Sequence, residues 1–348
     1  MARPVWLDRV FRGLMGVPGW FLDRLEPTPS GGAVPEWTEP VLRDRIRAEA
    51  RWPEAQLALE PQLHVHTDEA GVLGYEVRGS TVFGIGGLNT TDVASLLRSF
   101  VATAGNGARR HLLFPVRESE RAAVHDAGFG TLQVGVEGWL DLADLTWSGR
   151  RYQHVRHLRN KAQRLGVTCA EVDPAAVAVE LRAIHADWLR SKRPSWRMKL
   201  LVGSPGLDRP GDRRYFAART EGRVEAFLTL LPGADGQWGI DVMCRRPDGA
   251  KGTMEHLILH ATACLQAEGA ATLSLGPCPM ADVASPGPLG AVFRTLYGSS
   301  LGNQLFGFQN LHVFKQKFRP RWEPVYFAAA PRLGVFELYA GCRMWGLY

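Results

Sequence analysis

One acidic residue stands at a position suited to chemistry. Asp241 lies within Trp238–Met243, where the alternation of residue types predicts a β-strand. A carboxylate at a strand end can take a proton from a hydroxyl group or bind an ammonium group. The competing interpretation is an Asp that caps a helix or braces a loop. We take Asp241 as the first candidate catalytic residue.

A glycine-bearing loop follows this strand and opens a predicted helix, Thr253–Glu268. Gly249, Gly252 and Thr253 stand at the start of that helix. Their backbone N–H groups can meet an oxyanion or a phosphate at the positive end of the helix dipole. The loop resembles the pyrophosphate loop of CoA-dependent acyltransferases of the GNAT superfamily without matching it fully, so by itself it is a weak motif.

The most basic segment of the chain runs from residue 150 to residue 165. Apolar residues recur there at helical spacing, so one side can pack while basic side chains radiate from the others. A solvated helix that joins two domains is the competing interpretation. The candidate phosphate-binding residues in this segment are Arg156, Arg159, Lys161 and Arg164.

A second basic segment alternates cations with aromatic residues between residues 314 and 322. This interleaving suits the end of an RNA or a lipid headgroup. The alternative is that the aromatic rings form core and the cations extend to the surface. The candidates here are Lys315, Lys317 and Arg321.

Cysteine and histidine usage does not predict a metal site. The five cysteines form no C-x-x-C pair, which argues against a structural zinc site or a disulfide framework and fits a reducing cytoplasm. His64 and His66 would share one face of a strand near Asp68, but no third group of ligands accompanies them. We therefore expect no metal.

The elements that must position these residues follow one order twice. In the first half, a helix from about Val41 precedes the hairpin Gly71–Val77 and Thr81–Gly86, and a helix, a strand, a helix and a strand follow: Asp92–Ala104, His111–Pro115, Glu118–Ala127 and Thr131–Leu142. In the second half, the order is helix, hairpin, strand, helix and strand: Pro174–Ser191, Arg214–Leu231, Trp238–Met243, Thr253–Glu268 and Ala271–Gly276. The sequence therefore predicts an α/β (α+β) protein with a duplicated fold.

Composition limits the class of protein. A chain of 348 residues, 45% of them hydrophobic, is long enough for two packed domains, and its net charge of +6 favours anionic partners. No stretch approaches eighteen uninterrupted apolar residues, and no standard secretory signal is present. Amphipathic stretches near both ends, around Trp6 and Leu338, suit docking on the core or a membrane interface. We expect a cytoplasmic protein with peripheral contact to the inner face of the cell membrane.

Several separated motifs then appear in a recognisable order. They include Leu158-Arg159-Asn160-Lys161, Asp241-Val242-Met243, Arg246-Pro247-Asp248, Phe308-Gln309-Asn310-Leu311 and Trp322-Glu323-Pro324-Val325-Tyr326. From about Val72 to Ala328, this series resembles the C-terminal catalytic domain of bacterial lysylphosphatidylglycerol synthases. Motifs in the right order over most of the chain make a specific signal.

The resemblance implies two tandem GNAT-like folds joined by a basic helix, an aminoacyl-tRNA as donor and a hydroxyl of phosphatidylglycerol as acceptor. It implies no further cofactor. An aminoacyl ester is already activated, so the enzyme has to orient the donor, position a hydroxyl and stabilise an oxyanion. Besides the basic residues named above, the substrate-binding positions that it implies are Lys192, Glu255, Gly252, Thr253, Gly276, Asn310 and Tyr326.

One departure from the family concerns the residue three positions after Asp241. The family usually has Arg there, whereas this chain has Cys244 followed by Arg245 and Arg246. We place Arg245 at the reacting centre as the shifted arginine. A thiol does not replace guanidinium geometry, so altered amino acid specificity or lost activity are the alternatives.

The division expected from these patterns is an amphipathic N-terminal segment with a linker (1–40), a first GNAT-like domain (41–148), a basic connecting helix (149–167), a catalytic GNAT-like domain (168–330) and an amphipathic tail (331–348). Two other functions remain open. One is a CoA-dependent N-acyltransferase, and the other is a catalytically silent protein that binds tRNA or membranes. A soluble hydroxyl or amine acceptor in place of the lipid also remains open.

Overall fold

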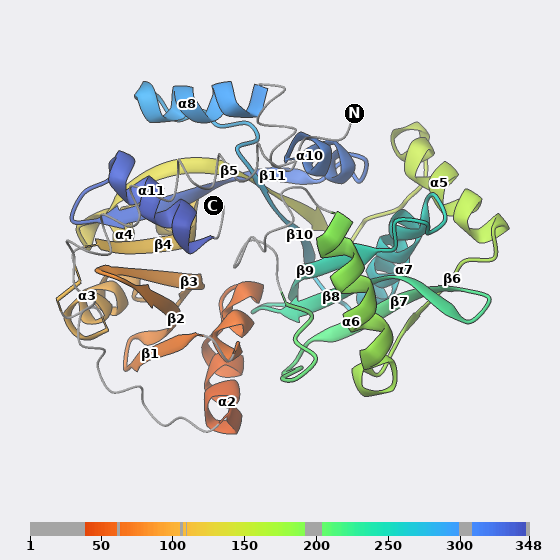
Figure 1. Ribbon diagram of the computed structural model, residues 1–348, viewed down its shortest axis with the longest axis horizontal. Helices are drawn as coiled ribbons and strands as arrows, with labels where there is room; N and C mark the ends of the chain where they lie inside the picture. Colours follow the sequence, from red (N-terminus) through yellow and green to blue (C-terminus); the bar gives the residue numbers. More distant parts are fainter. Residues whose placement is uncertain are drawn as a thin grey trace.

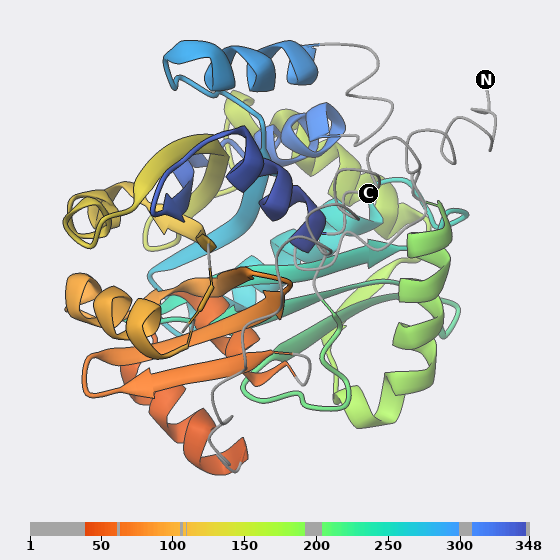
Figure 2. The same ribbon diagram turned by 60° about the vertical axis from the view of Figure 1, so that its left-hand side comes forward.

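The structure, a computed structural model, describes residues 39–60, 63–104, 107–108, 110–191, 204–298 and 308–345. The N-terminal stripe around Trp6 and the candidate Lys192 lie outside the described residues. Within them, one sheet of 11 strands runs through the molecule in the order β1-β2-β3-β4-β11-β5-β10-β9-β8-β7-β6. Helices cover both faces of this sheet (Figures 1 and 2), which confirms the α/β class.

The first half of the sheet begins as a meander. The antiparallel strands are β1 (His64–Asp68), β2 (Gly71–Arg78) and β3 (Thr81–Asn89), and the β2–β3 pairing confirms the predicted hairpin. Helix α3 (Val93–Thr103) then leads to β4 (Arg110–Arg117), which pairs parallel with β3. The short helices η2 (Glu118–Glu120) and α4 (Arg121–Asp126) precede β5 (Gly130–Asp141).

The second half repeats this order. After η3 (Arg150–Tyr152) and α5 (Gln153–Arg164) come β6 (Thr168–Glu171), α6 (Pro174–Ser191) and the antiparallel strands β7 (Arg214–Thr220), β8 (Arg223–Pro232) and β9 (Gln237–Arg245). Helix α7 (Thr253–Ala267) then leads to β10 (Thr272–Pro279), which pairs parallel with β9. The predicted duplication is therefore present in the topology, with α5 as the basic link.

The last strand of the chain belongs to the sheet of the first half. Helices α8 (Gly287–Gly298) and α10 (Phe308–Gln316) precede β11 (Arg321–Ala330), and α11 (Val335–Met344) follows it. Strand β11 lies between β4 and β5 and pairs antiparallel with both. A domain boundary at residue 330 would thus assign β11 to the second domain, although this strand completes the sheet of the first half. The division into two domains stays a prediction.

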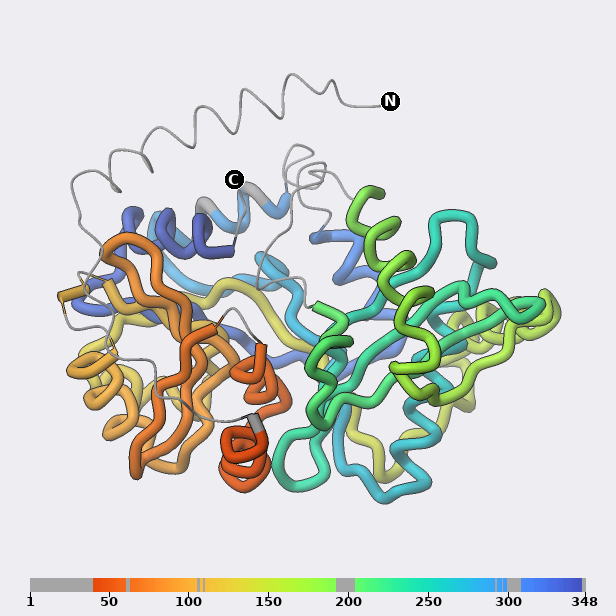
Figure 3. The backbone as a smooth tube through the Cα atoms, turned by 60° about the horizontal axis from the view of Figure 1, so that its bottom comes forward, coloured from red at the N-terminus to blue at the C-terminus, as the bar shows by residue number. Residues whose placement is uncertain are grey.

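A short 3₁₀ helix packs between the two halves of the continuous sheet. Helices α2 (Glu39–Glu49) and η1 (Pro53–Leu59) lie between the β2–β3 and β8–β9 hairpins, as Figure 3 shows for the red segment of the tube. The contact is close on both sides. A Cβ atom on Gly86 of β3 would lie 2.7 Å from the Glu54 carbonyl oxygen, and one on Gly239 of β9 would lie 2.8 Å from Pro53. Glycine at both positions allows η1 to sit directly against the two strands.

Candidate active site

The parallel strands of the second half stay paired over a short length only. Strands β9 and β10 pair from Gln237 with Thr272 to Gly239 with Ser274, and both strands continue beyond that point. They therefore diverge immediately before Asp241. Ligands of open α/β sheets bind near such points, because the loops and strand ends there leave backbone groups without strand partners.

A β-bulge in β9 sets the direction of Asp241. The register between β8 and β9 shifts between Leu228 and Leu230, so that Asp241 and Val242 together oppose Thr229. The Val242 backbone N–H donates to the Thr229 hydroxyl at 3.1 Å, which satisfies a group that the ladder leaves unpaired. Bulges re-aim side chains at functional sites.

Strand β10 carries a bulge that faces the first one. Its register with β5 shifts between Ser274 and Pro277, and Gly276 in this bulge has φ +80°. A Cβ atom on Gly276 would lie 3.4 Å from both the Ile240 carbonyl oxygen and the Lys315 ammonium. The structure therefore brings two candidates, Gly276 and Lys315, to the place where the strands diverge at Asp241.

Asp241 belongs to a buried cluster centred on Arg213. The Arg213 Nη2 donates to the Glu60 carboxylate at 2.6 Å, and its Nε donates to Asp241 at 3.3 Å. The three side chains are 2%, 9% and 7% exposed, respectively. Glu60 follows η1 directly, so the segment between the halves supplies one carboxylate of this cluster.

Burial changes the protonation of Asp241. Desolvation raises the pKa of Asp241 to about 6, although the charge of Arg213 acts in the opposite direction. A carboxyl with this pKa is ionised at neutral pH and still basic enough to accept a proton from a hydroxyl. These are the properties that a general base requires.

A second buried arginine lies on the side of the first half. The Arg117 Nη2 donates to Glu54 at 2.8 Å and to Glu137 at 3.0 Å, and its guanidinium lies 4.2 Å from the ring centre of Trp52. The Ser274 hydroxyl donates to Glu137 at 2.5 Å and links this cluster to β10. Burial raises the pKa of Glu137, against the effect of Arg117.

Lys315 occupies a buried position rather than a surface one. Its ammonium donates to the carbonyl oxygens of Gly276 at 2.9 Å and Pro277 at 3.0 Å, and the residue is 3% exposed. Burial lowers the pKa of Lys315. A lysine has three donors, so one N–H remains beyond these two bonds.

The two clusters together hold more carboxylates than cations. Because an unbalanced buried charge is costly, a cationic group that enters here is favoured. The acidic members are Glu54, Glu60, Glu120, Glu137 and Asp241, and the basic members are Arg117 and Arg213, with Arg51 acting on Glu120 and Lys315 on Glu137.

The residues after Asp241 serve the loop that follows β9. Arg245 donates to the Gly249 carbonyl oxygen, and Arg246 donates to the Val224 carbonyl oxygen at 2.8 Å. Cys244 is fully buried in an apolar cluster with residues of α6. The contacts of Arg245 therefore hold the loop, and its assignment to the reacting centre stays a prediction.

The start of α7 packs against the basic helix. A Cβ atom on Gly252 would lie 2.2 Å from the Leu158 carbonyl oxygen of α5. Thr253 is fully buried, and its hydroxyl donates to the Ala250 carbonyl oxygen at 2.8 Å. Glu255 forms an ion pair with Lys317 at 2.8 Å. Helix α5 thus occupies one side of the glycine-bearing turn.

Two other candidates do not meet Asp241. Tyr326 lies on β11 in the apolar cluster shared with α3, and its hydroxyl donates to Glu118. Asn310 is exposed on α10. Their substrate-binding roles stay predictions.

The basic residues of α5 differ in their contacts. Arg156 donates to the carbonyl oxygens of Trp147 at 2.8 Å and Gly149 at 2.6 Å, so it holds the preceding loop. Arg164 is exposed, whereas Arg159 and Lys161 are half-buried. In the second basic segment, Arg321 pairs with Asp141 at 3.2 Å. The structure does not bring all the predicted phosphate-binding residues onto one surface, because Lys315 is buried.

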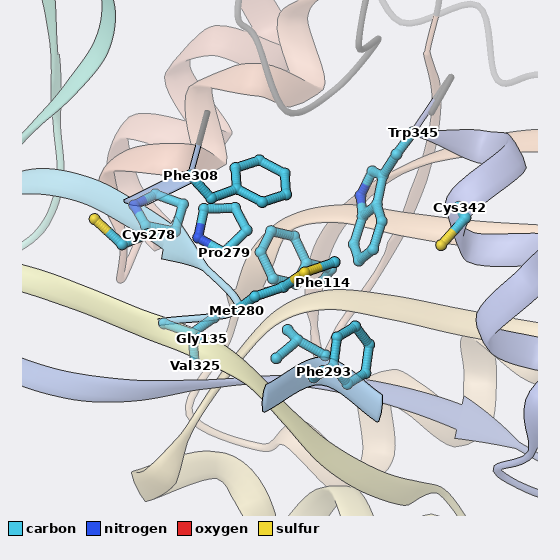
Figure 4. Close-up of a pocket in the computed structure, with 12 residues that line it drawn as sticks. Phe114, Gly135, Cys278, Pro279, Met280, Phe293, Phe308, Val325, Cys342 and Trp345 are labelled. Atoms are coloured by element: carbon cyan, nitrogen blue, oxygen red, sulfur yellow. The ribbon is translucent and has the colours of Figure 1, made fainter. Parts of the chain in front are cut away.

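An apolar pocket lies beside β5 and β11, and Figure 4 shows the side chains that line it. It contains about 450 Å³ of empty space, part of it open to solvent. Trp345 and Cys342 stand on one side of it, and Phe308 and Pro279 stand on the other. The remaining lining residues are Phe114, Val134, Gly135, Pro277, Cys278, Met280, Phe293 and Val325.

The sequence patterns single out Asp241 but not most of the residues that surround it. Glu54, Glu60, Arg117, Glu137 and Arg213 come from separate elements, and Glu60 is 153 positions from Arg213. No spacing of residues within one element predicts such a cluster. The available signal was limited to Arg117 and Glu137, which are isolated charges within otherwise apolar strands.

The described part of the chain lacks a membrane-spanning helix and a metal-binding cluster. None of its helices is both long and apolar enough to cross a membrane. It contains no group of three or more His, Cys, Asp or Glu residues arranged to hold a metal ion. His66 instead lies 3.3 Å from Asp68, and His64 stacks on Tyr75.

Comparison with known proteins now decides the family. The model of the family described as "Phosphatidylglycerol lysyltransferase, C-terminal" matches residues 47–329. The chain belongs to this family. The resemblance carried by the sequence motifs is therefore confirmed. Helix α11 lies beyond the matched residues.

Relatives and solved structures agree with this assignment. Phosphatidylglycerol lysyltransferase of Bacillus subtilis (strain 168) is 25% identical over 244 residues, which cover 67% of this chain and 28% of that protein. The chain thus spans little more than a quarter of that relative. The structure of L-PGS from Bacillus licheniformis has a TM-score of 0.74 at 20% identity and covers 90% of this chain and 96% of that chain.

A second solved structure has the same fold. The C-terminal domain of a putative lysylphosphatidylglycerol synthetase from Agrobacterium fabrum has a TM-score of 0.70 at 21% identity and covers 88% of this chain and 95% of that chain. These likenesses support the arrangement of the sheet described above. The site chemistry rests on the residues of this chain.

Proposed function

We propose that this chain transfers an aminoacyl group from an aminoacyl-tRNA to a hydroxyl group of phosphatidylglycerol or a related lipid. The observation that carries the proposal is the buried excess of carboxylates around Asp241, whose pKa burial raises to about 6. The ammonium group of a donor amino acid would compensate this charge. Membership of the phosphatidylglycerol lysyltransferase family supports the lipid as acceptor.

The proposed reaction is direct transfer. Asp241 takes the proton of the acceptor hydroxyl as its oxygen attacks the carbonyl carbon of the aminoacyl ester. The resulting tetrahedral oxyanion collapses, the bond to the ribose oxygen of the tRNA breaks, and the proton returns from Asp241 to that oxygen. The products are the aminoacylated lipid and the free tRNA, with Asp241 regenerated.

Lys315 is our candidate for stabilising the oxyanion. Its ammonium is buried beside Gly276, where β9 and β10 diverge, and two of its three donors are engaged by carbonyl oxygens. The third can donate to the developing negative charge, which is worth more in a site away from water than at the surface. The two bonds to carbonyl oxygens fix its position before the reaction begins.

We place the tRNA on the face of α5. Arg164 is exposed there, and Arg159 and Lys161 are partly accessible. Contact with a membrane is part of the same proposal. The adjacent side chains Val335 and Phe336 at the start of α11 are 69% and 58% exposed, and the Arg332 side chain beside them is 74% exposed. A basic residue next to exposed apolar side chains suits an anionic lipid surface.

The test is a transfer assay with separate donors. Purified chain is incubated with radiolabelled aminoacyl-tRNAs, one at a time, and with phosphatidylglycerol vesicles, and label is followed into the organic phase. Label in lipid supports the proposal and names the amino acid. Intact aminoacyl-tRNA together with acyl transfer from acetyl-CoA would replace it with the CoA-dependent function, and binding of tRNA without turnover would replace it with the silent binder.

A further inference from the structure

One arginine serves two carboxylates in the cluster around Asp241. The Arg213 Nη2 donates to Glu60 at 2.6 Å, and its Nε donates to Asp241 at 3.3 Å. Charge-assisted N–H···O bonds are typically about 2.7–2.9 Å long, so the bond to Glu60 is the strong one and the bond to Asp241 is the weak one. Because both donors belong to one planar group of fixed geometry, Arg213 cannot approach Asp241 without changing its bond to Glu60.

The loop before β7 fixes the position of Arg213. The Arg213 Nη1 donates to the Arg209 carbonyl oxygen at 3.4 Å. Gly206 has φ +64°, and a Cβ atom on it would collide with the Arg213 guanidinium. The preceding residue, Asp212, is anchored to helix α2 by an ion pair with Arg43 at 2.8 Å. The guanidinium is therefore enclosed and does not follow either carboxylate freely.

Glu60 is held in place by the segment between the two halves. Its backbone N–H donates to the Leu57 carbonyl oxygen of η1 at 3.0 Å, and its carbonyl oxygen accepts from the Leu63 N–H at 3.0 Å. The residue is 8% exposed. The separation of Glu60 from Arg213 is thus set by the packing of η1 against the sheet, and the strand that carries Asp241 does not set it.

The charged and titratable groups that face Asp241 come from several elements packed around it. They are Arg213 and Tyr215 before and within β7, Glu54 and Glu60 within and after η1, and Lys315 of α10. Burial raises the pKa of Tyr215 to about 12, so its hydroxyl stays neutral between pH 5 and 8. Glu54 is held by Arg117, and Lys315 is held by two carbonyl oxygens. Glu60, in contrast, shares its cation with Asp241.

We propose that Glu60 is a positioning residue for the transfer: because it takes the shorter bond to Arg213, Asp241 is held loosely and stays available to accept a proton. Burial is the main cause of the raised pKa of Asp241, and the negative charge of Glu60 raises it further, against the charge of Arg213. A carboxylate held closely by the arginine would be a weaker base. This inference rests on the proposed function for the identity of the reaction, whereas the sharing of Arg213 stands without it.

The experiment titrates Asp241 directly in the whole chain. The side-chain carboxyl carbons of aspartate are labelled with ¹³C, and the Asp241 signal, assigned by its loss in Asp241→Asn, is followed by NMR from pH 4 to 8. Glu60→Gln should lower the midpoint by about one pH unit, because it removes a nearby negative charge and lets Arg213 pair with Asp241 alone. Glu60→Asp keeps the charge and retracts it, so it should lower the midpoint by a smaller amount and carries the test if Glu60→Gln does not fold.

The matched control is Glu337→Gln on α11. Glu337 is also a buried carboxylate beside an arginine, with Arg110 at 3.6 Å, and it lies outside the cluster around Asp241. Its replacement should leave the midpoint of Asp241 unchanged. A loss of stability in Glu60→Gln with an unmoved midpoint would show that Glu60 is only structural and would overturn the inference.

Transfer by the same variants gives the second readout. At pH 8, where Asp241 is ionised in all of them, Glu60→Gln should lower kcat about threefold and leave KM unchanged, because a weaker base accepts the proton less readily. A lowered midpoint without transfer in any variant would support the control of Asp241 by Glu60 while the proposed function fails. Transfer with a midpoint that stays in place or rises in Glu60→Gln would overturn the inference alone.

Discussion

Two buried arginines, Arg117 at the end of β4 and Arg213 just before β7, make comparable contacts and have different surroundings. Each donates to one carboxylate supplied by or next to η1 and to a second one on a sheet strand. The bonds around Arg117 are 2.8 and 3.0 Å long and are supported by a tryptophan ring. Asp241 accepts from Arg213 at 3.3 Å and has a pKa raised to about 6. We infer that the first cluster is structural and that the second, under the proposed function, supplies the reacting carboxylate.

The parallel strand pairs next to the two clusters also differ, in the length over which they stay paired. In the first half, β3 and β4 remain paired over five residues, and the backbone of η1 lies against the bulge at Gly86. In the second half, β9 and β10 remain paired over three residues, and a charged side chain lies in the bulge. The same architecture is thus filled by the η1 backbone in one half and holds a charged side chain in the other, as the proposed function requires.

The strongest test removes one carboxylate from each arginine. Asp241→Asn should lower kcat/KM for transfer by about 10²–10⁴-fold, because it removes the proton acceptor while conserving side-chain size. The matched variant Glu54→Gln should change kcat/KM by less than about threefold and cost about 1 kcal/mol of stability. Steady-state kinetics and chemical denaturation measure the two effects. Equal losses of turnover would abolish the distinction between the clusters.

Replacing the arginines themselves should have the second-largest effect. Arg117→Leu leaves Glu54 and Glu137 as buried, uncompensated carboxylates and should lower the free energy of unfolding by about 3–5 kcal/mol. Arg213→Leu should cost less, because it leaves two carboxylates, Glu60 and Asp241, without their cation, whereas Arg117 faces three. Urea denaturation of both variants at one pH makes the comparison. A larger loss for Arg213→Leu would contradict it.

The pH dependence of transfer should be smaller but diagnostic. The pKa of Asp241, about 6, lies above its ordinary value of 3.8, so the carboxyl binds a proton as the pH falls through 6. Transfer should therefore decline about tenfold per pH unit below 6. Arg213→Leu should move the midpoint to higher pH, because it removes the charge that lowers this pKa. The check is a kcat/KM profile from pH 5 to 8. An unmoved midpoint would assign the titration to another group.

The smallest expected effect is on the salt dependence of tRNA binding. It distinguishes an exposed arginine, Arg164, from Arg156, which holds a loop in place. Arg164→Gln should reduce the salt slope of tRNA binding by about one, because it removes one phosphate contact. Arg156→Gln should leave the slope nearly unchanged and lower stability, because Arg156 is engaged by the carbonyl oxygens of Trp147 and Gly149. Filter binding at several salt concentrations tests both. Equal slopes for the two variants would show that neither contact acts as described.

Most elements could be predicted from local patterns, whereas the surroundings of Asp241 could not. Alternating apolar residues identified the β7–β8 hairpin, and the predicted helix from Thr253 matches α7. The burial of Lys315 could not be predicted, because spacing shows which residues share a face but not whether that face is buried. The Arg213 cluster depends on η1, whose seven residues carry little periodicity. Long-range packing decides such details.

The place of β11 has a consequence for biosynthesis. Strand β5 ends at Asp141, and the strand that joins it to β4 begins at Arg321, about 180 residues later. At roughly 5–20 residues per second, a ribosome needs roughly 10–40 s to make that stretch. Throughout this interval β4 and β5 each present an unpaired edge to the cell. The nascent chain therefore has its greatest need of chaperone protection after its first half is made and before its last strand emerges.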